Sequence, residues 1–314
     1  MQEIEVAIIG SGPAGLTAGV YTSRARLKTT LFAGQEIGGQ LMYTTDVENF
    51  PGFPEGKSGP LLMMDLQKQA QRFGTEIVFA TVSKVDFSKR PFKLWVNAAA
   101  DQEADYQAKS VIISTGASSI MLGVPGEKEY LGRGVSTCAV CDAAFYRDKN
   151  VYVIGGGDSA MEDTLALTKF ASEVTVVHRR DSFKASKIMQ ERVLNNPKIK
   201  VLWNSQLLAV EGDGKQVTHA LLDISGKKEK VAANGVFLAI GHKPASTLFR
   251  EQLQIDSAGY IELAAHPTYS TQTSVEGVFA AGDVTDHRYR QAIVSAGMGA
   301  KAALDAEHFL AGQE

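Results

Sequence analysis

Short apolar runs that end in glycine divide the chain, and the first of them predicts a strand, a turn, a helix and a second strand. Residues 6–9 contain only Val, Ala and Ile and lead into a glycine-rich turn. Residues 14–24 follow without proline and predict a helix, and residues 29–32 form the next short apolar run. Runs of this length bounded by turn residues are typical of strands buried in a parallel sheet. We therefore expect a βαβ unit here.

The turn after the first strand has the spacing of a dinucleotide-binding loop. Its residues are Gly10, Ser11, Gly12, Pro13, Ala14 and Gly15. The first glycine permits the tight turn, the second lets a pyrophosphate approach the backbone, and the third lets the helix pack on the strand, while the helix N-terminus attracts phosphate. An acidic residue that holds the ribose is expected about 20 residues later. Glu36 lies slightly beyond that point and is the only candidate taken from the sequence.

The same pattern returns near the middle of the chain. Residues 151–154 form an apolar strand, a predicted helix covers residues 161–170, and residues 174–177 form the following strand. The intervening turn reads GGGDSA, with alanine in place of the third glycine, which the dinucleotide fingerprint tolerates. Its residues are Gly155, Gly156, Gly157, Asp158, Ser159 and Ala160. Two such units in the right context are stronger evidence than a lone glycine motif.

Basic residues follow the last strand of this second unit, where an NAD-binding protein would normally carry an acid. They are His178, Arg179, Arg180 and, four residues further on, Lys184. Cations at this position suit the 2′-phosphate of NADP. Basic loops are more often simply solvated, but the place directly after a dinucleotide-binding strand favours a phosphate clamp.

Two further apolar strands closed by glycine, residues 111–116 and 236–241, each follow one dinucleotide unit and predict a duplicated domain. A third, at residues 277–283, has no βαβ unit of its own. It should therefore complete the first domain, with the second inserted between its halves. Glycine and proline near Thr115 and at residues 242–244 mark the expected crossings.

The predicted fold class is accordingly α/β, with two Rossmann-like three-layer dinucleotide-binding domains. The predicted boundaries are 1–114 for the first part of the outer domain, 115–244 for the inserted domain and 245–314 for the second part of the outer domain. An alanine-rich stretch without proline, residues 290–310, predicts a terminal helix. A length of 314 residues agrees with two domains, because single cores usually stop growing near about 250–300 residues.

Charge and apolar content restrict the partners. A net charge of −3 gives no field for holding nucleic acid or an acidic membrane, both of which need clustered Lys and Arg. The first apolar run is short and follows two glutamates, so neither a signal peptide nor a membrane span is expected. We therefore expect a cytoplasmic protein with no nucleic-acid or membrane partner.

The two cysteines of the chain, Cys138 and Cys141, lie three residues apart, just before the second glycine turn. A reducing cytosol would open a structural disulfide, which favours a catalytic pair. A zinc site would need two further ligands, but there are no other cysteines and the six histidines include no close pair with ligand spacing, so no metal is expected. A dithiol between two dinucleotide units predicts electron transfer from one cofactor, through another, to a disulfide.

Taken together and in this order, the motifs resemble the low-molecular-weight thioredoxin reductases of the bacterial type over nearly the whole chain. Along the chain they are GSGPAG, then GGQL at residues 38–41, VENFPG at 47–52, the CxxC pair followed by Asp142, GGGDSA, HRR, and Gly282-Asp283 followed by YRQA at 289–292. Each motif alone is weak, whereas their order is highly specific.

The resemblance implies that the first unit binds FAD and that the inserted unit binds NADPH, so that the NADPH domain is inserted into the FAD domain. It adds as flavin-site residues Gly39, Gln40, Asn49, Gly282, Asp283, Arg290, Gln291 and Ala292. The candidate cofactor-binding residues also include those that close the two similar apolar strands, namely Thr115, Gly116 and Gly241. The implied partner is thioredoxin, and a homodimer is expected.

The resemblance also implies the roles of the redox residues. Cys141 is the cysteine proximal to the flavin, Cys138 attacks the disulfide of the protein substrate, and Asp142 donates a proton to the departing thiolate. The chain departs from the family in having Ala143-Ala144 where glycine commonly follows Asp142. It also has Lys184 where the family has arginine, and lysine lacks the bidentate fork, so a weaker preference for NADPH over NADH is expected.

Three alternatives stay open at this level. The same chemistry can serve another small carrier, such as a glutaredoxin-like or peroxidase-linked domain, because the partner surface carries no motif. A non-catalytic redox-sensing flavoprotein would use the dithiol as a switch and show negligible turnover. A plain NAD(P)H oxidase is a third alternative, but it would not need both cysteines.

Overall fold

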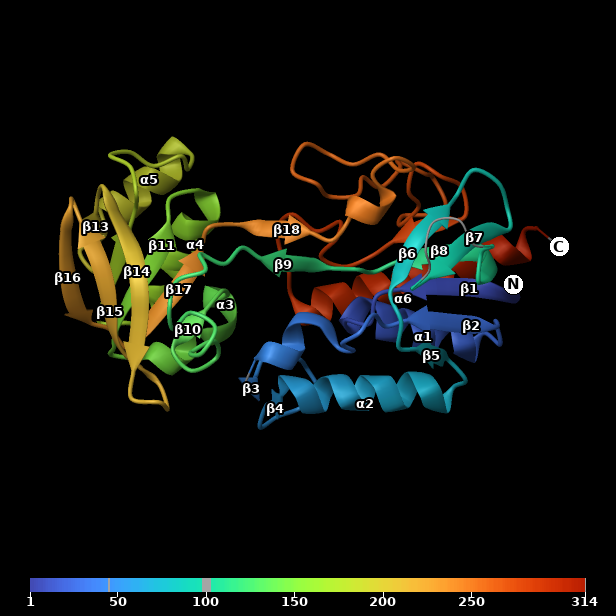
Figure 1. Cartoon of the computed structure of the whole chain (residues 1–314), viewed down its shortest axis with the longest axis horizontal. Coiled ribbons are helices and arrows are strands. Elements are labelled where there is room, and N and C mark those ends of the chain that lie inside the picture. Colours follow the sequence, from blue (N-terminus) through green and yellow to red (C-terminus); the bar gives the residue numbers. More distant parts are fainter. Residues whose placement is uncertain (45, 98–102, 314) are drawn as a thin grey trace. The chain divides into compact units, whose positions relative to one another are not determined.

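The computed structural model describes residues 1–44, 46–97 and 103–313, and the chain divides into two compact units. Unit 1 contains Met1–Ser118 and Lys243–Glu314, whereas unit 2 is the continuous stretch Ser119–His242 (Figure 1). Unit 2 is thus inserted, in sequence, between the two segments of unit 1.

Unit 1 is built on a seven-stranded sheet. Its strands are β1 (Gln2–Ile9), β2 (Thr29–Phe32), β5 (Glu76–Val78), β6 (Val82–Asp86), β7 (Phe92–Val96), β8 (Tyr106–Ile113) and β19 (Val278–Ala280). Six of them follow the order β5-β2-β1-β8-β7-β6, and β19 also pairs with β8. The pairs among β5, β2, β1, β8 and β19 are parallel, whereas β7 is antiparallel to both β6 and β8.

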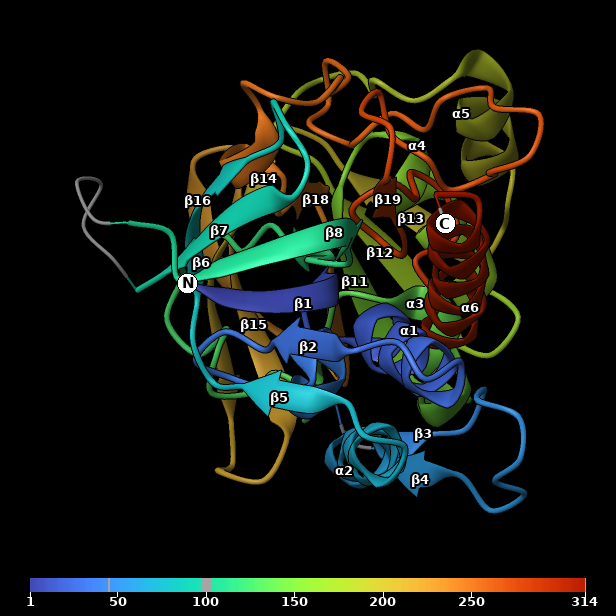
Figure 2. The same cartoon turned by 90° about the vertical axis from the view of Figure 1, so that its right-hand side faces the viewer.

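Helices cover one face of this sheet (Figure 2). They are α1 (Pro13–Arg24), α2 (Gly59–Arg72) and α6 (Ala292–Ala311). Alternate residues of a strand point to opposite faces. Ile112 of β8 and Phe279 of β19 accordingly pack in the core under the helices, while Ile113 and Val278 belong to the core on the other face.

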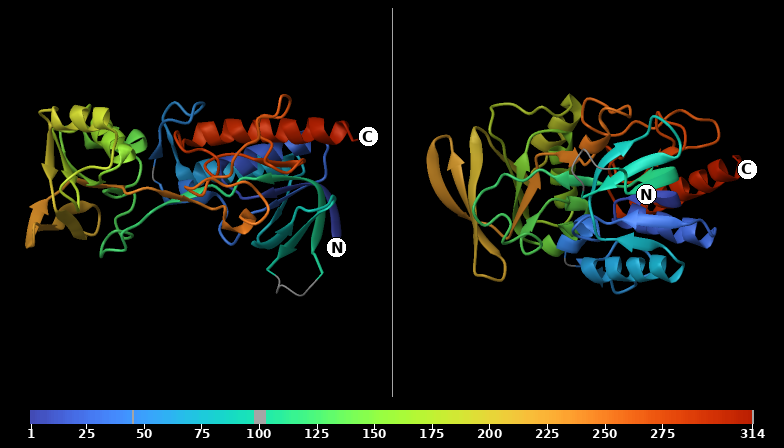
Figure 3. Two further views of the ribbon diagram at one scale, coloured as in Figure 1. Left: turned by 90° about the horizontal axis from the view of Figure 1, so that it is seen from above. Right: turned by 45° about the vertical axis from the view of Figure 1, so that its right-hand side comes forward.

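Helices α1 and α6 approach closely because small residues line their contact, and α6, red in the figures, lies along α1 (Figure 3). A Cβ atom at Gly299 of α6 would lie 2.1 Å from the carbonyl oxygen of Ala14. Pro13 occupies the first turn of α1, where its missing N–H costs nothing. The alanine-rich composition of α6 thus serves close packing as well as helix propensity.

Unit 2 has a parallel five-stranded sheet in the order β10-β17-β11-β12-β13. Its strands are β10 (Val135–Ser136), β11 (Asn150–Gly155), β12 (Glu173–Val177), β13 (Ile199–Leu202) and β17 (Gly235–Ala239). A separate antiparallel sheet consists of β14 (Ser205–Gly212), β15 (Val217–Ile224) and β16 (Lys227–Ala232). The helical elements are α3 (Ala139–Asp142), η2 (Ala143–Tyr146), α4 (Asp158–Leu167) and α5 (Lys187–Leu194).

Two cores on opposite faces of the parallel sheet make unit 2 a three-layer structure. Val153 of β11 and Phe237 of β17 belong to the core shared with α3, η2 and α4. Their neighbours Ile154 and Leu238 belong to the core shared with the antiparallel sheet. The predicted α/β class with two Rossmann-like units is therefore confirmed.

Short elements complete both units. They are η1 (Gly39–Tyr43), β3 (Asp46–Val47), β4 (Lys57–Ser58), β9 (Ala117–Ser119), β18 (His242–Pro244) and η3 (Thr247–Phe249). β9 and β18 pair as a two-stranded ribbon where the chain crosses between the units. The units divide within this ribbon, at 118/119 and 242/243, rather than at the expected 114/115 and 244/245. The pairing continues extended backbone past Gly116 and up to Pro244, the residues expected to break it.

Candidate active site

The first glycine turn leaves an open space at the N-terminus of α1. A Cβ at Gly10, where φ is +116°, would lie 2.3 Å from the carbonyl oxygen of Ser114, and one at Gly15 would lie 2.0 Å from the carbonyl oxygen of Gly10. A Cβ at Gly12 would meet no atom within 4 Å. No side chain caps α1. Two glycines therefore serve packing, while the space beside Gly12 and the free N–H groups fit a phosphate.

Ser11 joins the first turn to the segment after β2. Its hydroxyl donates to the carbonyl of Ala33 at 3.1 Å and accepts from the backbone N–H of Gly38 at 3.2 Å. A Cβ at Gly39 would lie 3.4 Å from the Cα of Gly12, so η1 starts beside the open space. Gln40 is exposed on η1. Glu36 is also exposed, and its carboxylate accepts a hydrogen bond from Tyr43, so its partner comes from its own loop.

Gly282 and Asp283 reach the same turn from the second segment of unit 1. Gly282 has a φ of +80°, and a Cβ there would lie 3.0 Å from the Cβ of Ala14. The carboxylate of Asp283 accepts a 2.7 Å hydrogen bond from the hydroxyl of Ser295 on α6. Burial raises the pKa of Asp283, and the Ser295 hydrogen bond opposes this shift. The carboxylate of Asp283, next in the chain to Gly282, has capacity for a further donor.

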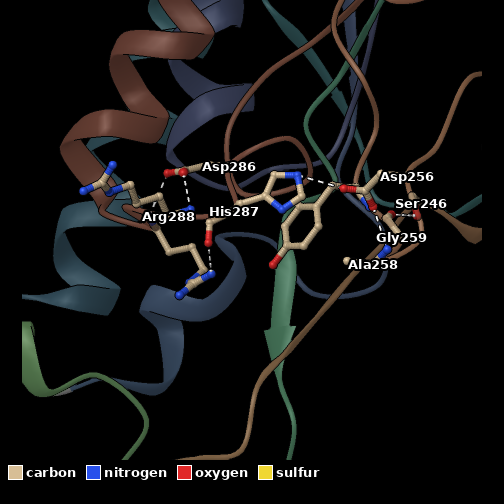
Figure 4. A network of polar contacts seen from close by, with 9 residues as sticks. Ser246, Asp256, Ala258, Gly259, Asp286, His287 and Arg288 are labelled. Atoms are coloured by element: carbon tan, nitrogen blue, oxygen red, sulfur yellow. Dashed lines mark hydrogen bonds and ion pairs between the residues drawn. The ribbon is translucent and has the colours of Figure 1, made fainter. Parts of the chain in front are cut away.

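The loop before α6 is fixed by the buried carboxylate of Asp286 (Figure 4). This carboxylate accepts from the backbone N–H groups of Arg288, Tyr289 and Arg290 at 2.7–2.9 Å, and Arg290 has a φ of +46°. Gln291 is the residue before α6, which starts at Ala292. The Gln291 side-chain oxygen accepts from Asn49 at 3.1 Å.

The two remaining candidates of unit 1 lie at the crossing. Thr115 donates its hydroxyl proton to the carbonyl of Ala245 at 2.7 Å, and the carbonyl of Gly116 accepts from the backbone N–H of Ala245. Gly116 has a φ of +72°. Both residues therefore hold the two crossing strands together inside unit 1.

The second glycine turn repeats the design of the first in unit 2. A Cβ at Gly155 would lie 2.4 Å from the carbonyl oxygen of Ala239 and 2.8 Å from the Cβ of Ala160, whereas one at Gly157 would meet nothing within 4 Å. No side chain caps α4, whose first residues are Asp158 and Ser159. The open place beside Gly157 again fits a phosphate.

The basic segment lies against this second turn. The imidazole of His178 is buried directly under Gly156, where a Cβ would come within 2.2 Å of the ring. Arg179, Arg180 and Lys184 are exposed. Within the ranges that the structure describes, none of these three cations has an ion-pair partner, which leaves them available to an anion. Gly241, after β17, has a φ of +118°.

Cys138 and Cys141 form a disulfide with a Cα–Cα distance of 5.3 Å. Cys138 directly precedes α3, and its sulfur accepts a hydrogen bond from the backbone N–H of Cys141 at 3.2 Å. Cys141 is exposed and Cys138 is half-buried, with exposed Val140 between them. After reduction, the same N–H group would stabilise a thiolate on Cys138.

Asp142 follows directly in a half-buried position. Burial raises the pKa of its carboxyl, while a hydrogen bond from Ser136 lowers it. Burial raises the pKa of the nearby Tyr146 phenol, and the charge of Asp142 raises it further. The carboxyl of Asp142 therefore holds a proton more readily than a free aspartate, as an acid next to a leaving thiolate should.

Sequence reasoning missed the polar residues that hold these loops. Ser114 donates to the carbonyls of Ile9 and Gly10, Asp286 organises the loop before α6, and Ser186 binds Asp158. Asp286 and Ser186 lie in stretches without a motif. The only signal for Ser114 was its position as the last residue before Thr115 and Gly116 at the end of an apolar strand.

Two glycine turns, each at the end of a parallel strand, and a disulfide before the second turn define a dinucleotide-dependent disulfide oxidoreductase. The chain belongs to the pyridine nucleotide-disulphide oxidoreductase family, whose model matches residues 4–299. The thioredoxin reductase of Yarrowia lipolytica is 48% identical over 323 residues, covering 100% of both chains. That of Mycolicibacterium smegmatis is 49% identical over 311 residues, covering 99% of this chain and 97% of the relative.

A solved structure extends the similarity to three dimensions. The thioredoxin reductase of Giardia duodenalis matches with a TM-score of 0.92 and 47% identity, covering 99% of this chain and 100% of that one. Among the described residues of the present chain, no helix has the length and apolar character needed to cross a bilayer. The same residues contain no group of three or more His, Cys, Asp or Glu that could hold a metal ion.

Proposed function

We propose that the chain is an NADPH-dependent thioredoxin-disulfide reductase with FAD as its resident cofactor. The observation that carries the proposal is the disulfide between Cys138 and Cys141, which lies in the same unit as a complete second glycine turn. Relatives named thioredoxin reductase at about half identity over the full chain support the choice of substrate.

FAD is assigned to unit 1 and NADPH to unit 2. In unit 1, the open space beside Gly12 would take the pyrophosphate. The carboxylate of Asp283, which accepts one hydrogen bond from Ser295 through Oδ1, would accept another from a hydroxyl group of the cofactor. In unit 2, Gly157 would take the second pyrophosphate, and the exposed cations Arg179 and Arg180 would take the 2′-phosphate. A bound flavin can accept a hydride from a nicotinamide and pass an electron pair on to a disulfide.

The protein residues then transfer the electron pair to the substrate. NADPH and one solvent proton provide two electrons and two protons, which open the Cys138–Cys141 disulfide to a dithiol. The Cys138 thiolate attacks one sulfur of the thioredoxin disulfide and forms a mixed disulfide, and Asp142 protonates the departing thiolate. Cys141 attacks Cys138, which releases the second thioredoxin thiol and restores the internal disulfide.

The layout also supports a rotation between half-reactions. The dithiol and the second glycine turn belong to unit 2, whereas the first turn belongs to unit 1, so both must reach the flavin in turn. The ribbon of β9 and β18 is the only described covalent connection between the units. Hinges of a few residues absorb such motions, and we propose rotation about this ribbon.

A homodimer and a cytoplasmic location complete the proposal. Leu61 and Met64 on α2 are exposed by 53% and 44%, and apolar side chains this accessible suit a subunit interface. Sedimentation at micromolar concentration tests the dimer. The cytoplasm is favoured because a reductase that draws on NADPH operates where thiols are kept reduced.

The deciding experiment is an NADPH-oxidation assay of the purified protein with a panel of oxidised carriers. Thioredoxin, a glutaredoxin and a peroxidase-linked carrier domain are compared at equal concentration. We expect turnover with thioredoxin to exceed the others by at least about tenfold, with one released FAD per chain. Turnover with another carrier alone would reassign the substrate. The absence of turnover with every carrier would favour the redox-sensing alternative.

A further inference from the structure

The basic segment after β12 is fastened to the second glycine turn by contacts that no motif predicts. Residues 178–186 form a loop that carries the cations and returns to the start of α4. Gly156 and Asp158 of the turn itself anchor the far end of this loop, residues 184–186, and the buried ring of His178 anchors its near end. The following inference rests on the proposed NADPH site.

The carboxylate of Asp158 forms one anchor. Its Oδ1 atom accepts two hydrogen bonds from Ser186, one from the backbone N–H at 2.9 Å and one from the hydroxyl at 2.8 Å. These hydrogen bonds lower the pKa of Asp158, so the group is ionised at neutral pH. An acid beside the expected pyrophosphate would repel it, which makes a purely phosphate-binding role unfavourable for Asp158.

The backbone of Gly156 forms the second anchor. Its carbonyl oxygen accepts from the backbone N–H groups of Lys184 at 2.8 Å and Ala185 at 3.2 Å. The backbone of Lys184 is thus fixed to the turn while its side chain remains exposed.

The other end of the loop is held by His178. Its buried ring lies under Gly156, and its Nε2 atom hydrogen-bonds with the carbonyl of Ser182 at 3.0 Å. The ring also packs against Phe183, which packs in turn on Trp203 with ring centroids 4.4 Å apart. Arg179 and Arg180 therefore follow directly after a residue, His178, that is fixed by this packing.

We propose that Asp158 is a positioning residue for nucleotide specificity. It fixes the far end of the loop, next to Lys184, while His178 holds the end that carries Arg179 and Arg180, so that the three cations are presented together to the 2′-phosphate. Pre-organisation of the three cations lowers the ordering cost of binding. It also explains how a lysine can serve at position 184, because a fixed backbone compensates for the missing bidentate fork.

A positioning role for Asp158 affects the affinity for NADP⁺ alone, whereas direct contact with the pyrophosphate would change the affinities for NADP⁺ and NAD⁺ together. Replacing Asp158 by alanine removes the two hydrogen bonds that hold Ser186, at the Lys184 end of the loop, and leaves Gly157 intact. We expect binding of NADP⁺ to weaken about five- to tenfold, while binding of NAD⁺, which lacks the 2′-phosphate, changes by less than about twofold. Asp158→Asn keeps an acceptor for Ser186 and should stay within about threefold of the wild type for NADP⁺.

The experiment measures dissociation constants of NADP⁺ and NAD⁺ by titration calorimetry on the FAD-loaded protein. Asp213→Ala is the matched control, because Asp213 is also exposed, lies in unit 2, and accepts backbone hydrogen bonds from Lys215 and Gln216 at 2.9 Å. It should leave both constants unchanged. If Asp158→Ala does not fold, Ser186→Ala provides the second test, with an expected NADP⁺ loss of about two- to threefold.

Each outcome decides the matter. Selective loss of NADP⁺ binding in Asp158→Ala supports the positioning role. Equal changes for NADP⁺ and NAD⁺, or tighter binding of both, would overturn it and leave Asp158 as a local charge. If the wild type itself binds both nucleotides equally, the proposed NADPH preference fails first, and this inference fails with it.

Discussion

Two opposing effects act on the pKa of Asp142, the acid beside the dithiol. Burial disfavours the charged carboxylate of Asp142 and raises its pKa, while the Ser136 hydroxyl partly offsets that shift. An aspartate in water has a pKa near 3.9 and would seldom hold a proton at neutral pH. The half-buried position of Asp142 therefore makes it a better proton donor than an exposed turn aspartate would be.

Asp142→Asn should separate catalysis from stability. Loss of the proton donor should slow thioredoxin reduction by about 100-fold or more. The folded pKa of Asp142 lies above its unfolded value, so its contribution to stability is complete below the unfolded pKa and is lost as pH rises through the folded pKa. The variant should gain stability relative to the wild type as pH rises from 3 toward 8. Urea unfolding across this range measures the difference, and a gain that instead grows toward low pH would contradict the burial argument.

The two cysteines should differ in a trapping experiment. With a thioredoxin that lacks its resolving cysteine and carries its remaining cysteine as a mixed disulfide with thionitrobenzoate, Cys141→Ser should accumulate a stable mixed disulfide through Cys138. Thionitrobenzoate is the leaving group, and no second thiol releases the product. Cys138→Ser should trap little. Both variants should still oxidise NADPH with ferricyanide at rates near the wild type. Non-reducing electrophoresis detects the complex, and efficient trapping by Cys138→Ser would reverse the assigned roles.

At the scale of elements, neighbouring glycines of the second turn have different tasks. A Cβ at Gly156 would meet the imidazole of His178 at 2.2 Å, whereas a Cβ at Gly157 meets nothing within 4 Å. Gly156 lets the turn pack on His178, and Gly157 leaves a surface free for the proposed dinucleotide.

Two alanine variants should make this difference measurable. Gly156→Ala should lower the free energy of unfolding by about 1–3 kcal/mol, because the core beneath it must shift. Gly157→Ala should change stability by less than about 0.5 kcal/mol, since its φ of −96° suits alanine, yet weaken NADP⁺ and NAD⁺ alike. Denaturation and nucleotide titration of both variants test the pair. Equal stability losses would show that the turn is packed uniformly.

The strands and helices next to the glycine turns were predictable because their apolar periodicity and glycine spacing are local. Residues 29–32 were predicted as a strand and match β2, and the predicted 290–310 helix is α6 within two residues at its start. The predicted 161–170 helix instead runs over Asp158–Leu167, because a helix can start directly at the phosphate turn. The antiparallel strands β14–β16 pair with their neighbours in the chain, and Asp286 binds N–H groups two to four residues further on, but neither stretch carries a glycine fingerprint. Ser186 depends on Asp158, which lies 28 residues before it, and no local pattern indicates that contact.

At the scale of the whole molecule, the proposed rotation predicts more than one arrangement of the two units. Fluorophores can be attached at Lys89→Cys in unit 1 and Lys215→Cys in unit 2, two exposed positions, while the native pair remains a disulfide. Single-molecule energy transfer between the two fluorophores should show two populations of molecules with different transfer efficiencies. NADP⁺ should shift the ratio of these populations. One population that does not respond to NADP⁺ would contradict the rotation. The same labels at Lys89 and Lys301, both in unit 1, provide the rigid control.

The pairing of β8 with β19 has a consequence for how the molecule is made. β8 ends at Ile113 and β19 starts at Val278, and all of unit 2 lies between them. At about 5–20 residues per second, a ribosome needs roughly 8–30 s to span this distance. During that time unit 2 can fold completely, whereas the edge of β8 waits without its neighbour. The unit that is synthesised first is therefore completed last, and the nascent chain exposes a strand edge that a chaperone would have to shield.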